Sequence, residues 1–105
     1  MKHLVSALLL GVLGSHGAQA NQALAASKNC MACHAVEQKI VGPAFSAVAA
    51  KYAGDKTAQD MLVQKIQKGG AGVWGDMPMP ANSQLSTADA KKLTAWILAL
   101  PPKAP

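Results

Sequence analysis

The stretch that decides the fold is Cys30-Met31-Ala32-Cys33-His34. Two residues separate the cysteines, so their sulfurs lie about one helical turn apart, and the histidine follows on the same turn. This spacing is typical of c-type haem attachment, in which the two thiols form thioethers with the porphyrin and the histidine coordinates the iron. The pentapeptide therefore predicts haem attachment at Cys30 and Cys33, with His34 as an iron ligand.

Three other interpretations of the cysteine pair fit the sequence less well. A thioredoxin-like dithiol needs a βαβ framework, and no alternating β-branched run surrounds the motif. A zinc site wants a fourth thiolate or imidazole ligand, and His34 is the only histidine after residue 20. A structural disulfide in a helical binding module leaves His34 without a role. Haem attachment is the interpretation that uses all three side chains.

The N-terminal segment has the pattern of a secretory signal peptide. Lys2 precedes the apolar run 4–13, and Ala18-Gln19-Ala20 has the small residues that signal peptidase requires. The apolar run is far shorter than the roughly 20 residues of a membrane span. We predict cleavage after Ala20, which leaves residues 21–105 as one domain in the periplasm. An uncleaved anchor or a buried helix is the alternative.

The composition limits the function further. A chain of 105 residues is long enough for one domain and too short for a multidomain enzyme. Its ten basic residues are all lysines against five acids, which predicts a diffuse basic surface and no nucleic-acid binding. These lysines either steer an acidic partner or only keep the protein in solution. The chain has four aromatic residues, a small number that favours a large buried cofactor.

The spacing of apolar residues predicts an all-α domain. Gly42-Pro43 breaks the chain after the cysteine motif, and a glycine- and proline-rich loop over 69–83 is long enough to be functional. The expected helices are 22–28 with Asn21 as its cap, 45–52, a helix from the capping box Thr57-Ala58-Gln59-Asp60 to Gly69, and one from the capping box Ser86-Thr87-Ala88-Asp89 to about Leu100.

Methionine is the candidate for the sixth iron ligand, which decides between electron transfer, gas binding and catalysis. Met31 lies between the attachment cysteines and cannot reach the opposite haem face, and Met61 fits the inward face of a helix. Met77 and Met79 are each followed by a proline that stiffens the loop. The spacing does not distinguish Met77 from Met79 as the ligand. The alternative is that both methionines fill the haem crevice without binding iron.

Several separate motifs together resemble the small bacterial class I cytochromes c of the c-551 and c-552 group, in order along residues 21–105. The resemblance implies an all-α domain of about four short helices wrapped around one covalently attached haem c. The matching stretches are Cys30-Met31-Ala32-Cys33-His34, Val41-Gly42-Pro43-Ala44, Gly72-Val73-Trp74-Gly75, Met77-Pro78-Met79-Pro80-Ala81-Asn82 and Trp96-Ile97-Leu98.

The resemblance also implies the axial ligation. The iron-binding methionine of the family falls on Met79, while the position of Met77 is usually an aliphatic residue, so a methionine there is a departure from the family pattern. Pro43 matches the proline whose carbonyl accepts the proton on the far nitrogen of the ligand histidine, which would orient His34 and raise its basicity.

Three weaker roles follow from the same resemblance. Asn82 matches a side chain that hydrogen-bonds near the methionine sulfur, with a loop cap as the alternative. Trp74 matches a tryptophan whose indole N–H reaches a haem propionate, with plain core packing as the alternative. Lys65 falls where relatives often have an arginine that contacts the inner haem propionate. A lysine offers one compact charge there instead of the two parallel N–H donors of a guanidinium. A solvated surface charge is the alternative for Lys65.

The predicted function is that of a soluble single-electron carrier and not an enzyme. With both axial positions filled, no position is left for a substrate, and methionine ligation with burial predicts a positive reduction potential. A peroxidase or gas sensor is disfavoured because no distal histidine, arginine or carboxylate is available. We expect a monomer without membrane insertion. Its expected partners are a membrane cytochrome complex as donor and a terminal oxidase, nitrite reductase or cytochrome c peroxidase as acceptor.

Overall fold

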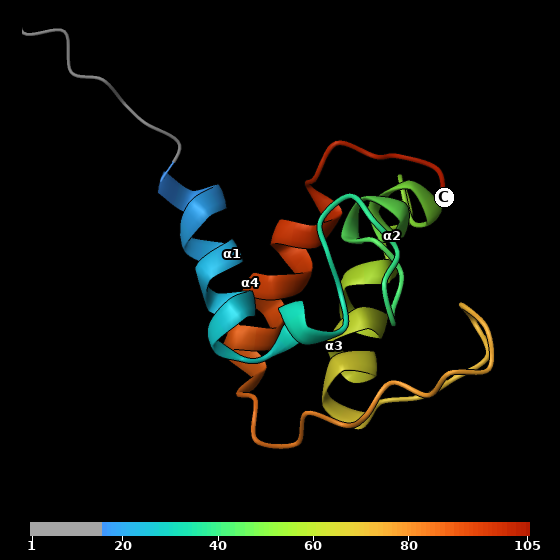
Figure 1. The fold of residues 1–105 in the computed structure, drawn as a ribbon. Coiled ribbons are helices and arrows are strands. Elements are labelled where there is room, and N and C mark those ends of the chain that lie inside the picture. Colours follow the sequence, from blue (N-terminus) through green and yellow to red (C-terminus); the bar gives the residue numbers. More distant parts are fainter. Residues whose placement is uncertain (1–15) are drawn as a thin grey trace, which may run out of the picture.

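The computed structural model describes residues 16–105, in which four α-helices and one 3₁₀ turn surround a common core (Figure 1). The prediction of an all-α domain is confirmed. Within this part of the chain no helix combines the length and the apolar character needed to cross a membrane. Most of the predicted signal peptide, residues 1–15, lies outside the described residues. The elements are α1 (His16–Ser27), the turn η1 (Cys30–Ala32), α2 (Phe45–Lys51), α3 (Ala58–Lys68) and α4 (Thr87–Leu98).

Helix α1 begins at His16, earlier than the sequence predicted, and it runs through the expected cleavage site after Ala20. Asn21 lies inside this helix, so its predicted role as an N-cap is wrong. The physical reason is that alanine and glutamine, which favour helix, continue on both sides of Asn21. The helix ends at Ser27, and Asn29 adopts a left-handed conformation with φ 63° that turns the chain into η1.

Helix α4 lies at the centre of the domain and contacts each of the other three helices (Figure 1). Leu93 and Thr94 are fully buried on its inner face. Phe45 of α2 meets Trp96 edge to face, with 5.6 Å between the ring centroids. The core consists of Ala25, Phe45, Val48, Val63, Ile66, Leu85, Ala90, Leu93, Trp96 and Ile97.

The two predicted capping boxes have different outcomes. Ser86 caps α4, because its Oγ accepts a hydrogen bond of 3.0 Å from the backbone N–H of Asp89. Thr57 makes no such bond to α3, and that prediction is wrong. Its backbone is already helical, and both its N–H and its hydroxyl donate to Asp55 Oδ1, at 2.9 and 2.7 Å. These two hydrogen bonds lower the pKa of the exposed Asp55 carboxyl.

This difference predicts unequal effects of two similar substitutions. Ser86→Ala should lower the free energy of unfolding by about 1 kcal/mol, because an N-cap hydrogen bond is lost. Thr57→Ala removes only an exposed hydrogen bond and should cost a few tenths of a kcal/mol. Urea unfolding of the holoproteins measures both values. Equal losses for the two variants would contradict the assignment of Ser86 as the working cap.

Candidate functional site

A mostly apolar cavity lies between the segment after η1, the helices α2, α3 and α4, and the loop that follows α3. Six of the eight residues predicted for the site line it: Cys33, His34, Pro43, Lys65, Trp74 and Met79. Cys30 and Asn82 instead line a separate polar groove between the end of α1 and the segment after the loop. Met61, expected in the core, is half-buried and lines the cavity from α3.

His34 is held in a fixed orientation by its neighbours. Its Nδ1 lies 2.8 Å from the carbonyl oxygen of Pro43, and since a carbonyl only accepts, the ring donates its N–H there. The neutral ring therefore keeps an unprotonated Nε2 that is suited to a metal. The ring also stacks on Phe45, with centroids 4.8 Å apart and planes 19° apart.

Gly42 explains why the chain can approach His34 so closely. A Cβ at this position would lie 2.5 Å from His34 Cε1, so any side chain would push the ring away. The sequence indicated Gly42-Pro43 only as a break in the chain. Neither this close approach nor the stacking of Phe45 was predicted, because both depend on contacts that no local pattern encodes.

The two cysteines and the histidine are gathered on one turn. The backbone N–H groups of Cys33 and His34 both donate to the carbonyl of Cys30, at 3.2 and 3.0 Å. The cysteines are not joined in a disulfide, and burial raises the pKa of the Cys30 thiol.

Met79 is positioned by backbone pairing. Its N–H and C=O exchange hydrogen bonds of 2.8 and 3.1 Å with Gly70, which closes the loop after α3 at its base. Gly69 has φ 71°, and a Cβ there would overlap the Met79 carbonyl oxygen and lie 2.8 Å from Ala81 N. Only glycine fits at position 69, where the end of α3 passes close to the backbone of Met79 and Ala81, without strain.

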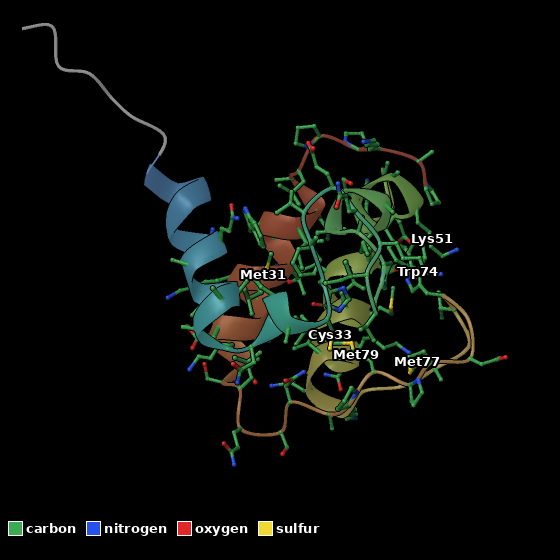
Figure 2. The ribbon with its side chains drawn as sticks, in the orientation of Figure 1. Met31, Cys33, Lys51, Trp74, Met77 and Met79 are labelled. Carbon is green, nitrogen blue, oxygen red and sulfur yellow. The ribbon has the colours of Figure 1, made fainter. Side chains whose placement is uncertain are left out.

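Met77 and Met79 differ in exposure, which the sequence spacing did not reveal. Met79 is partly buried and packs against the core, whereas Met77 is 67% exposed. Both line the cavity, and Figure 2 shows Met77 farther out along the loop than Met79. The thioether of Met79 is therefore the one held inside the domain.

The side chain of Asn82 ties the segment after the loop to α3. Its side-chain amide donates to the carbonyl oxygen of Ile66 at 3.1 Å, and its backbone N–H donates to the same oxygen at 3.0 Å. That carbonyl is available because Gly70, which would bind it in a longer helix, pairs with Met79 instead. These two bonds hold the end of the loop against α3, and the hydrogen bond of Asn82 near the methionine sulfur stays a prediction.

Lys65 and Trp74 are two of the polar-tipped side chains that line the mostly apolar cavity. Lys65 is partly buried, and its Nζ lies beside Gly70, where a Cβ would be 2.7 Å from it. Trp74 is also partly buried, and Lys51 Nζ lies 5.6 Å from the centroid of its ring (Figure 2). Both positions suit contacts with an anionic group at the cavity.

These donors fit a haem better than a structural metal ion. A cavity with a thiol, an oriented imidazole and thioether sulfurs offers the ligands that haem iron takes in c-type proteins. Across residues 16–105 no three His, Cys, Asp or Glu side chains gather into a possible metal cluster. The helical fold and this site together define the class I cytochromes c.

Comparisons with known proteins agree with this class. The model of the cytochrome c family matches residues 18–101, and the chain belongs to that family. It is 52% identical over 94 residues to cytochrome c-552 of Hydrogenobacter thermophilus, covering 89% of this chain and 95% of the relative. It is 53% identical over 83 residues to cytochrome c-551 of Allochromatium vinosum, covering 79% and 88%.

The fold agrees with a solved relative as well. The crystal structure of Nitrosomonas europaea cytochrome c552 matches with a TM-score of 0.73 and 53% identity, covering 75% of this chain and 98% of that one. The resemblance to the c-551 and c-552 group is confirmed. The protein is a small monohaem cytochrome that carries electrons with one covalently bound haem c.

Proposed function

We propose that this cytochrome is a periplasmic one-electron carrier whose haem is attached to Cys30 and Cys33 and whose iron is bound by His34 and Met79. The observation that carries the proposal is that His34 and Met79, each fixed by a hydrogen bond to backbone, line the same apolar cavity. When bound, the haem supplies the one-electron chemistry of its iron.

The chain tunes that iron through the two residues that bind it. The carbonyl of Pro43 fixes the tautomer of His34 and raises the basicity of its Nε2. The pairing of Gly70 with Met79 holds a thioether, which favours the ferrous state. An apolar lining disfavours the additional charge of the ferric state. The thioether ligand and the apolar lining therefore both raise the reduction potential.

Trp74 and Lys65 would hold the carboxylates of the haem. The indole N–H is a donor and the lysine is a cation, and both line the cavity that is otherwise mostly apolar. A buried carboxylate needs such partners, because burial of an unpaired charge is costly. Lys51, close to the face of the Trp74 ring, adds a cation–π contact that helps to fix the indole.

Export to the periplasm rests on the sequence of the first 20 residues, which we propose to be cleaved after Ala20. Leu24 and Ala25 of α1, which pack on the core, lie beyond the cleavage site and would keep these contacts. Residues 21–105 would then form the mature monomer, with the cysteine motif close to its N-terminus.

Redox partners would meet the protein at the mouth of the cavity. Val41, Val73 and Met77 line the cavity and are 51%, 50% and 67% exposed, and together they form the apolar rim. Exposed apolar groups of this kind mark interaction surfaces. The partners we propose are a membrane cytochrome complex as donor and a terminal oxidase, a nitrite reductase or a cytochrome c peroxidase as acceptor.

Carbon monoxide tests whether the sixth position is filled. We expect no change in the absorption spectrum when the reduced holoprotein is exposed to the gas, because Met79 occupies the position that the gas would take. Met79→Ala is the control, since it opens the position and should bind the gas. Rapid binding by the unmodified protein would favour a gas sensor or a peroxidase instead of an electron carrier.

A further inference from the structure

Met77 is the methionine that the proposed function leaves without a chemical role. It is 67% exposed, whereas Met31, Met61 and Met79 are all partly buried. Met77 also lies in the apolar rim, beside the mouth of the cavity. Its sulfur is therefore reachable from water and close to the surface where electrons are expected to leave.

We propose that Met77 is a site of reversible sulfoxidation, through which hydrogen peroxide makes the apolar rim polar. One peroxide oxygen is transferred to the thioether sulfur, the O–O bond breaks, and water is released. The sulfur is oxidised by two electrons to the sulfoxide and the peroxide is reduced. Methionine sulfoxide reductases reverse the change. The effect of this oxidation on electron transfer rests on the proposed function. The choice of Met77 as the oxidised residue does not.

The packing of the other methionines makes the reaction selective. Met31 and Met79 pack against the core, and Met61 faces the cavity from α3. Met79 is also held at the base of the loop by two backbone hydrogen bonds to Gly70, and exposing its sulfur requires the surrounding packing to open. Met77 needs no such opening, because most of its surface already faces solvent.

Oxidation would change docking without changing the iron site. A sulfoxide is a strong hydrogen-bond acceptor that must lose its water when two proteins meet at the rim, and Val41 and Val73 offer it no donor side chain. The hydrogen bond of His34 to Pro43 and the pairing of Met79 with Gly70 do not involve Met77. Intermolecular electron transfer should therefore slow while the spectrum stays unchanged.

Limited peroxide treatment of the holoprotein tests the site directly. Peptide mass mapping should find the gain of about 16 Da, one oxygen, on Met77 before any other methionine. The far-red band of the ferric protein should remain. Earlier oxidation of Met31, Met61 or Met79 would overturn the proposal. This measurement does not depend on electron transfer, so it separates the Met77 site from the proposed function.

Electron self-exchange between ferrous and ferric copies, measured by NMR line broadening, tests the consequence. Peroxide should slow self-exchange of the wild type by about fivefold or more, as expected when one polar group must be desolvated. Met77→Leu, compared with itself before and after peroxide, should show no slowing. Met77→Gln should be slow without peroxide. An unchanged self-exchange rate after complete oxidation of Met77 would overturn the proposal that its sulfoxidation controls docking at the apolar rim.

Discussion

Met79→Ala is expected to abolish the weak far-red sulfur-to-iron charge-transfer band of the ferric holoprotein, while Met77→Ala is expected to keep it. The reason is the difference in placement, because Met79 is partly buried and anchored by Gly70, whereas Met77 is 67% exposed on the rim. Optical spectra of the two variants, each oxidised and then reduced, make the comparison with matched substitutions in the same loop.

The reduction potential should separate the same two variants. Loss of the thioether ligand removes a group that favours the ferrous state, so the potential of Met79→Ala should fall on the order of 0.1–0.3 V, within the range that axial ligands control. Met77→Ala should change it little. If both variants keep the far-red band, Met61 on the wall of the cavity becomes the candidate ligand.

Gly69→Ala is expected to damage the iron site from a distance. Alanine at φ 71° and ψ −169°, a backbone region essentially restricted to glycine, costs about 1–3 kcal/mol in strain. Its Cβ would in addition overlap the carbonyl of Met79 and crowd Ala81, and relieving such overpacking typically costs about 1–3 kcal/mol more. Since the loop must move to make room, the methionine ligand should be displaced, and both the far-red band and the free energy of unfolding should decrease.

Gly54→Ala provides the matched control. Gly54 has a similar φ of 76°, but a Cβ there would meet nothing within 4 Å. This variant should therefore carry the strain of alanine at a positive φ without a steric overlap, with the far-red band intact. Urea unfolding and an optical spectrum of each variant are sufficient. Equal behaviour of the two variants would mean that the contact between Gly69 and Met79 does not control the loop.

Local patterns were sufficient for the parts of the structure that depend on neighbours in the chain. The motif from Cys30 to His34 predicted a single turn, and the structure joins its residues by backbone hydrogen bonds. The glycines at 69 and 70 predicted the end of α3, and Ser86 predicted the start of α4. Each of these signals acts within four residues, which is the range of a helical turn.

The predicted cap at Thr57 failed because a nearby group competes for its hydroxyl. Asp55 takes the hydroxyl of Thr57 away from α3. Ile66 takes the amide of Asn82, because the pairing of Gly70 with Met79 leaves that carbonyl without a helical partner. The sequence lists the possible donors and acceptors, but the choice between them depends on which segments the fold brings together.

The choice between Met77 and Met79 shows the same limit. Both precede a proline in the same loop, so spacing does not distinguish them. The resemblance to c-551 and c-552 cytochromes indicated Met79, and the structure supplies a physical reason to prefer it in its pairing with Gly70. That pairing joins residues nine positions apart, beyond the reach of helix periodicity.

Equilibrium redox titration of the holoprotein, followed by its absorption spectrum, tests most directly whether it is a one-electron carrier with histidine and methionine ligands. We predict one reversible step with the slope of a single electron and a positive midpoint potential, because Met79 and the apolar cavity both favour the ferrous state. A clearly negative midpoint, or a slope of two electrons, would contradict this function and the ligation by Met79.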